Sequence, residues 1–198
     1  MTPAALGIRM HSGWGTLVAV SGNADSLEIL HRRRINIVDP ADRGGRQPYH
    51  YAASLGLPEA ERYLASCAAV AERLALAAVE EVVRELDSGQ YCLRGSALLV
   101  ASGRPLPPLS RILAAHPLIH AAEGEFFRNS LRKACELLQI SVTVIREREL
   151  EERAKQAFGV AASRVSRRIS TLGSSIGPPW NKDHKTAALA AAMVLACP

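Results

Sequence analysis

Features that mark several common protein classes are missing from this sequence of 198 residues. Its four cysteines stand singly, with no C-x-x-C motif, which excludes a disulfide framework and a zinc clip of paired cysteines. The N-terminus lacks the charged and then apolar layout of a signal peptide, and the longest apolar run, 187–197, is too short to span a bilayer. We therefore expect a soluble, cytoplasmic protein with no membrane partner.

The sequence also has no internal repeat, and neither sign of charge dominates it. Lys and Arg total 24 and Asp and Glu total 19, so the formal net charge is +5. This excess allows an acidic partner such as nucleic acid but does not require one. A hydrophobic fraction of 48% with 22% charged residues is typical of globular proteins and excludes a disordered tail or a fibre. The length predicts a single domain over residues 1–198.

The N-terminal segment predicts a meander of three strands. Residues 6–20 are small, apolar and rich in glycine, as in two strands joined by a tight turn. Apolar residues alternate over 26–38, which predicts the third strand. The connection over 41–56 contains a glycine pair and an aromatic cluster, and we expect it to be irregular. Its length makes it a candidate functional segment.

Longer periodic patterns follow this connection. Apolar residues at steps of three and four predict a helix over 58–86, and a continuous apolar run over 96–101 predicts a strand buried on both faces. The remaining elements are expected as a helix over 117–138, a strand over 140–145, and helices over 148–158, 161–172 and 182–196. This order predicts an α/β fold with a mixed five-stranded sheet, in which a β-meander leads into parallel crossovers, flanked by helices.

Several segments in this order resemble one family. They are the opening strand 5–8 with its glycine-containing turn, the helix and strand over 124–138 and 140–145, and the C-terminal portion over 148–159, 165–172 and 183–190. Together they cover most of the chain and resemble the RuvC-type Holliday junction resolvases of the ribonuclease H-like superfamily. The resemblance implies a ribonuclease H-like fold, contact with nucleic acid and a homodimer, for which the long helix 58–86 offers an apolar seam.

The acidic residues that this family uses are mostly absent here. The resemblance implies carboxylates that hold two magnesium ions at a phosphodiester. The first acid belongs directly after Gly-Ile of the opening strand, where this chain has Arg9, whose charge would repel a metal ion. The second belongs at the end of the fourth strand, where 101–103 read Ala-Ser-Gly, and the last pair corresponds to Asp183 and Thr186. One carboxylate cannot organise two metal ions, so the resemblance implies a fold that has lost its nuclease centre.

Two residues of this centre each have two interpretations. Asp183 is the candidate catalytic and metal-binding residue, but an acid in the first turn of a helix also interacts favourably with the helix dipole. Arg9 either contacts a phosphate where the metal ions would lie, or pairs with Asp183 across the neighbouring strand and helix. Ser102 has no base nearby in sequence, and we expect it to be a turn residue.

A second group of possible metal ligands lies on one predicted helix. His116, His120 and Glu123 fall at i, i+4 and i+7, which places them on one face, as a zinc site needs. However, Pro117 indicates that His116 only caps the helix and points away. Because no further ligand or supporting acid is in sequence reach, we expect no zinc site, although Glu123 remains a candidate ligand.

Basic and aromatic clusters are the candidate contacts to nucleic acid. Arg164, Arg167 and Arg168 share one helix face, and a second basic run covers 31–34. These side chains either neutralise phosphates or form a solvated face balanced by nearby glutamates. The Tyr-His-Tyr group at 49–51 either stacks on bases or plugs the loop against the core.

Three functional hypotheses follow. The first is a catalytically degenerate ribonuclease H-like domain that acts by binding, to nucleic acid or to a second copy of itself. The second is an active structure-specific endonuclease that uses magnesium or manganese on an unusual ligand set of Asp183 with Glu123 or Glu125. The third is a protein-interaction module that binds no nucleic acid.

Overall fold

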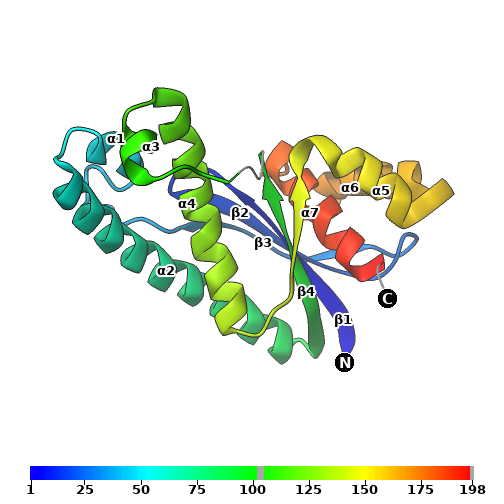
Figure 1. Ribbon diagram of the computed structural model, residues 1–198. Coiled ribbons are helices and arrows are strands. Elements are labelled where there is room, and N and C mark those ends of the chain that lie inside the picture. Colours follow the sequence, from blue (N-terminus) through cyan, green and yellow to red (C-terminus); the bar gives the residue numbers. More distant parts are fainter. Residues whose placement is uncertain (102–104, 197–198) are drawn as a thin grey trace.

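A mixed five-stranded sheet forms the centre of the computed structural model, which describes residues 1–101 and 105–196 (Figure 1). The strands are β1 (Thr2–Met10), β2 (Trp14–Ser21), β3 (Glu28–Asn36), β4 (Tyr91–Val100) and β5 (Val142–Arg146). Their spatial order is β3-β2-β1-β4-β5. β2 pairs antiparallel with β1 and β3, whereas β4 pairs parallel with β1 and β5. The carboxyl ends of β1, β4 and β5 therefore meet at one edge of the sheet.

Helices connect these strands and cover both faces of the sheet. They are α1 (Pro48–Ala52), α2 (Leu57–Ser88), α3 (Leu109–Leu113), α4 (His116–Leu137), α5 (Leu150–Phe158), α6 (Ala162–Ile176) and α7 (Lys182–Ala196), with short 3-10 turns at Glu147–Glu149 and Gly159–Ala161. α2 and α4 lie on one face, and α5, α6 and α7 lie on the other (Figure 1).

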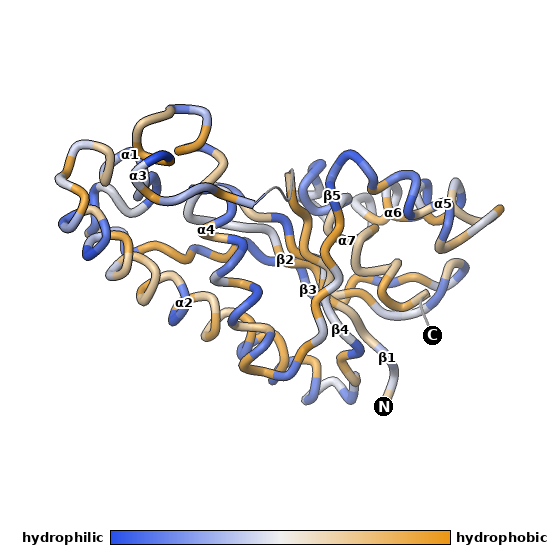
Figure 2. The backbone as a smooth tube through the Cα atoms, viewed as in Figure 1, coloured by the Kyte–Doolittle hydropathy of each residue, from blue (hydrophilic) through white to orange (hydrophobic). Residues whose placement is uncertain are grey.

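Successive side chains of the central strands point to opposite faces of the sheet, so each face has its own core. Leu6 and Ile8 of β1 pack with Phe127 on the side of α2 and α4, whereas Ala5 packs with Ala187 on the side of α7. Because helices cover both faces, these strands consist almost entirely of apolar residues and do not alternate between apolar and polar residues. Figure 2 shows hydrophobic stretches in the sheet and a mixture of hydrophobic and hydrophilic residues along α2.

The expected sheet and helix order is confirmed, with differences where local signals are weak. The last helix has the predicted range, but β4 begins at Tyr91, five residues before its apolar run, because its first residues are partly exposed. The expectation of an irregular connection over 41–56 is wrong in part, since α1 forms there with Pro48 in its first turn. The sequence did not predict α3, a helix of five residues that is too short for a periodic pattern.

The aromatic group on α1 packs rather than projecting freely. Tyr49 meets Phe126 edge to face at 6.0 Å between ring centroids, and Tyr51 lies 4.6 Å from the ring of Tyr63. Tyr49 also packs against the small core between α1 and α2. These contacts favour the interpretation in which the group plugs the loop, although Tyr51 is 47% exposed.

The apolar stripe of α2 is covered within the chain. Its buried residues, among them Ala75, Val79 and Val82, belong to the core beneath the sheet, and α2 packs along α4. The stripe is therefore not the free seam that the sequence suggested for a homodimer. Over the described residues, no helix has the length and apolar character that crossing a bilayer requires. Cys67, Cys92 and Cys135 are free thiols, and Cys197 lies outside the described residues.

Candidate functional site

The backbones of β1 and α7 approach each other closely at Gly7 and Ala187. A Cβ atom built on Gly7 would lie 1.8 Å from the carbonyl oxygen of Ala187, so only glycine fits there. Arg9 follows Gly7 by two residues and projects from the same face of the strand. Asp183 precedes Ala187 by one helical turn and shares its face of α7. The close contact therefore brings Arg9 and Asp183 together at the end of β1.

Arg9 and Asp183 are the centre of a cluster of ionisable side chains. Arg9 Nη1 donates to Asp183 Oδ1, while Arg9 Nε and Nη2 donate to Glu147 Oε1 and Oε2 at 3.2 and 2.9 Å. His11 Nε2 lies 2.9 Å from Asp183 Oδ2. The side chains of Arg9 and Asp183 are only 16% and 14% exposed. All four carboxylate oxygens of the cluster therefore have partners.

The charges of this cluster stabilise one another. Burial raises the pKa of Asp183, but the hydrogen bond with His11 and the positive charge of Arg9 outweigh burial, so this pKa lies below its ordinary value. The hydrogen bond with Glu147 raises the pKa of Arg9 against the opposing effect of burial. Near neutral pH the pair is therefore fully ionised. Of the two interpretations of Arg9, the structure shows the ion pair with Asp183.

The other positions at which the resemblance places acids carry no carboxylate. Thr186 turns its hydroxyl back onto its own helix, where Oγ1 donates to the carbonyl oxygens of Lys182 and Asp183 at 3.0 and 3.1 Å. Ser102, which we expected to be a turn residue, lies outside the described residues. Within the described residues, the cluster thus has no free carboxylate pair for a divalent ion.

Glu147 is the second acid of the cluster, and it was not among the site residues expected from the sequence. Glu147 comes directly after β5, whose carboxyl end meets that of β1 at the same edge of the sheet. In parallel sheets this edge is where functional side chains converge. An acid placed directly after a predicted parallel strand was therefore the available signal.

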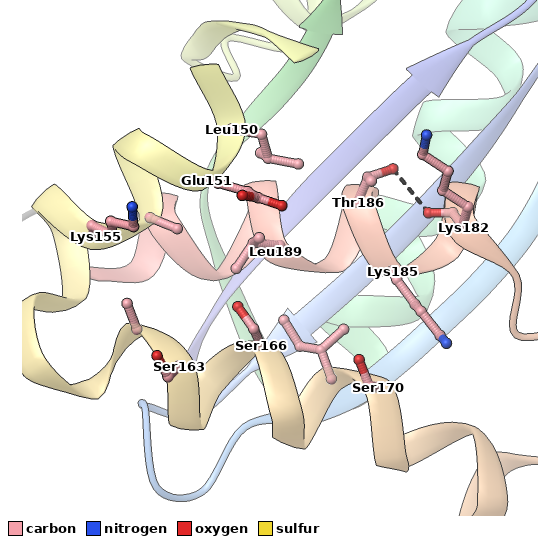
Figure 3. Close-up of a pocket in the computed structure, with 13 residues that line it drawn as sticks. Leu150, Glu151, Lys155, Ser163, Ser166, Ser170, Lys182, Lys185, Thr186 and Leu189 are labelled. Atoms are coloured by element: carbon pink, nitrogen blue, oxygen red, sulfur yellow. Dashed lines mark hydrogen bonds between the residues drawn. The ribbon is translucent and has the colours of Figure 1, made fainter. Parts of the chain in front are cut away.

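A groove of about 610 Å³ begins beside this cluster and runs between α5, α6 and α7 (Figure 3). α6 contributes the hydroxyl groups of Ser163, Ser166 and Ser170. α7 contributes Lys182 and Lys185, and Lys185 extends toward α6 whereas Lys182 points away from it (Figure 3). Neither lysine belongs to an ion pair within the described residues, in contrast to Lys133 and Lys155. Glu151 of α5 is the acidic side chain of the lining.

The three arginines expected to form a solvent-exposed basic face on α6 are only partly free. Arg164 is exposed but pairs with Asp25 at 3.0 Å. Arg168 is half-buried, and its Nε donates to the carbonyl oxygen of Leu27 at 2.8 Å. Arg167 is exposed. The expectation that all three side chains stand in solvent is therefore wrong for Arg168, which connects α6 to the segment before β3.

The basic run on β3 also has structural partners. Arg32 donates to the carbonyl oxygens of Ile176 and Gly177, both at 2.7 Å, at the end of α6. His31 and Arg33 pair with Glu85 of α2. The remaining residue of the run, Arg34, lies over the ring of Trp14. These contacts fix the helices against the sheet and leave little of this run for phosphates.

The ligand set proposed for an unusual nuclease is not assembled. Asp183 lies on α7, whereas Glu123 and Glu125 lie on α4, which covers the opposite face of the sheet. Glu125 instead pairs with Arg128 and Arg132 at 3.2 and 3.3 Å. The described residues therefore bring neither glutamate to Asp183.

The expectation that His116 caps α4 and points away from His120 is wrong. His116 is the first residue of α4, with Ala115 as the N-cap, and its ring centroid lies 4.4 Å from that of His120. His50 of α1 lies beside both rings, and its Nδ1 lies 2.9 Å from Oε1 of the buried Glu123. The structure thus supplies a third imidazole from a distant segment, and Glu123, which the sequence suggested as a ligand, lies against His50 as a supporting acid.

Comparison with known proteins identifies the fold. A scan against protein-family models and a search of curated proteins find no match to this chain. Among solved structures, RuvC of T. thermophilus in complex with a Holliday junction substrate matches with 15% identity and a TM-score of 0.52, over 96% of this chain and 90% of that one. A second Thermus thermophilus RuvC structure matches with 13% identity and the same TM-score of 0.52, over 96% and 91%. The chain therefore has the ribonuclease H-like fold of the RuvC structures, as the sequence analysis expected.

The charge of Asp183 is expected to stabilise the fold near neutral pH. In Asp183→Asn the free energy of unfolding should fall by about 1–2 kcal/mol, because Arg9 loses a partly buried ionised partner. Since folding lowers the pKa of Asp183, this stabilisation is present above the unfolded-state pKa of about 3.9 and is lost as pH falls through the folded-state value. Urea unfolding at a series of pH values measures the difference.

The exposed Asp87→Asn is the matched control and should change stability by no more than about 0.5 kcal/mol. A stability difference for Asp183→Asn that stays constant from neutral pH to well below about pH 3.9 would contradict the assignment.

Proposed function

We propose that this chain binds nucleic acid at the edge of the sheet formed by the end of β1 and the start of α7, without metal-dependent cleavage. The observation that carries the proposal is the ion pair of Arg9 with Asp183 and Glu147. It puts a fixed cation where the resemblance implies magnesium ions. Because this cation is already bound by two carboxylates, it excludes a metal ion rather than binding a phosphate itself, and it cannot activate water as a metal ion does.

The residues of this centre do not fit the pair of metal ions that the fold family implies. A divalent ion bound by Asp183 would lie within a few ångströms of the Arg9 guanidinium, where like charges repel strongly at this degree of burial. It would also have to displace Arg9 and His11 from the two carboxylate oxygens. Thr186 offers a hydroxyl already bonded to its own helix. This centre therefore supports no metal-dependent cleavage step.

Binding of nucleic acid is supported by the fold and by the groups beside the ion pair. One of the RuvC structures holds a Holliday junction substrate, so this fold can present a surface to a nucleic acid. In the present chain, Lys182 and Lys185 flank Asp183 in the first turn of α7 and are not paired with acids within the described residues. Lysine side chains, serine hydroxyls and helix N-termini are the usual contacts to phosphate oxygens.

A homodimer remains part of the proposal, but α2 does not supply its seam. The apolar stripe of that helix is covered by the sheet and α4. A dimer would therefore have to use another surface, and the binding proposed here requires only groups of one chain.

The first test of the proposal is a cleavage assay. We expect purified protein to leave branched and single-stranded DNA uncut with magnesium or manganese, because Arg9 and Thr186 stand at acid positions of the resemblance. Product formation is measured on gels over a range of ion concentrations. Cleavage that disappears in Asp183→Asn would show that the centre is active and would overturn this part of the proposal.

The second test measures how affinity depends on salt. If Lys182 and Lys185 each neutralise a phosphate, their joint replacement by alanine should reduce the slope of log affinity against log salt by about 2, since each contact contributes roughly 0.9 on duplex DNA. Fluorescence anisotropy of a labelled duplex and a labelled four-way junction, from about 50 to 200 mM salt, gives this slope.

The control has the same loss of charge elsewhere on the molecule. Arg62 and Arg73 are exposed on α2, on the opposite face of the sheet from α7, and their joint replacement by alanine should leave the slope unchanged. Absence of binding at about 50 mM salt would count against nucleic acid and favour a protein partner, whereas equal slopes for the two double variants would rule out Lys182 and Lys185 as the phosphate contacts.

A further inference from the structure

Three imidazoles meet where α1 packs against the start of α4. His116 and His120 occupy i and i+4 positions in the first two turns of α4, so they lie on one face of that helix. His50 reaches the same place from α1, which lies more than sixty residues earlier in the chain. One nitrogen atom of each ring can be chosen so that the three atoms lie within 4.8 Å of one another.

The spacing of these nitrogens is close to that of ligands around a metal ion. His50 Nε2 and His116 Nε2 are 3.4 Å apart. Two imidazole nitrogens bound to zinc at about 2.0–2.1 Å in tetrahedral geometry are separated by about 3.3 Å. The ring of His120 lies 4.7 Å from that of His50 and 4.4 Å from that of His116, between centroids. One pair of nitrogens therefore has the separation expected of zinc ligands, and the ring of His120 lies beside both of the others.

A buried carboxylate supports this arrangement independently of the ring spacing. The Glu123 side chain is 3% exposed, and its Oε1 lies 2.9 Å from Nδ1 of His50 and accepts the backbone N–H of the same residue at 3.2 Å. When Nδ1 carries the proton and donates to Glu123, the lone pair of His50 is on Nε2, which faces His116. Histidine ligands of metal ions are commonly held by a carboxylate in this way.

We propose that His50, His116 and His120 form a binding site for a divalent transition-metal ion of the zinc type, with Glu123 as the positioning residue of His50. Three imidazoles are ligands typical of zinc and its neighbours in the first transition row. His116 and His120 are exposed, so a fourth position is open to water or to an external ligand. The negative charge of Glu123 partly compensates the charge of the ion at the positive end of α4.

This site is separate from the proposed nucleic-acid contact. α4 covers the face of the sheet opposite to α7, and none of the three histidines contacts Arg9 or Asp183 within the described residues. A bound ion would connect the 41–56 segment to α4 and so stabilise the fold at this end. Failure of either proposal therefore leaves the other intact.

The test uses full-length protein without a histidine tag, stripped of metal by a chelator and then dialysed against zinc. We expect one zinc ion per chain, measured by elemental analysis, and a rise in melting temperature on addition of zinc. His116→Ala and His120→Ala change exposed residues and should fold normally. Each should weaken zinc binding by more than roughly 100-fold in competition with a chromogenic chelator, because even the loss of a supporting residue costs about 10–100-fold.

Two further variants separate this site from incidental binding to histidine. His31→Ala removes a histidine of β3 that pairs with Glu85, and it should leave zinc affinity unchanged. Glu123→Gln should weaken binding by about 10–100-fold and change the visible absorption of the cobalt-loaded protein, since it alters the orientation of His50. If Glu123→Gln does not fold, the two exposed variants of α4 decide the question. No zinc retained by the unchanged protein, or equal affinity in His120→Ala and His31→Ala, would overturn the proposal.

Discussion

The contact between the backbones of β1 and α7 at Gly7 and Ala187 is the constraint on which the charged centre depends. No side chain separates the strand from the helix at this point, and small residues continue along the buried face of α7. The first turn of that helix therefore lies directly over the end of β1. The side chains at the two positions nearest to this contact, Arg9 and Asp183, are therefore held close enough to form an ion pair.

Because Arg9 and Asp183 have opposite charges, their side chains can lie this close together without a metal ion between them. Two carboxylates at that distance would need a cation between them, whereas a guanidinium and a carboxylate neutralise each other and use their hydrogen-bonding groups together. Arg9 also binds Glu147, so the same guanidinium engages both acids of the cluster at the edge where β1, β4 and β5 end. The charges of this centre are thus satisfied internally, beside a groove in which Lys182 and Lys185 have no ion-pair partner among the described residues.

The spacing of apolar residues in the sequence predicted most of the strands and helices. The five strands, the long α2 and the bounds of α7 follow from apolar spacing, and the pairing of Arg9 with Asp183 was one of two alternatives implied by the resemblance. Partners that are distant in sequence were not predictable in this way, as with His50 beside His116. Nor could the sequence show that Arg32 and Arg168 donate hydrogen bonds to backbone carbonyl oxygens. Every residue carries such an acceptor, and no sequence pattern marks which carbonyl oxygen an arginine will bind.

If Arg9 excludes divalent ions from Asp183, the ion pair must persist when such ions are supplied. A crystal structure of the protein soaked in manganese, with anomalous difference maps, is the decisive measurement. We expect Arg9 and His11 to stay on the oxygens of Asp183, with no anomalous peak within ligand distance of that carboxylate. A manganese ion bound to Asp183, with the Arg9 side chain displaced from it, would show that Arg9 does not exclude divalent ions.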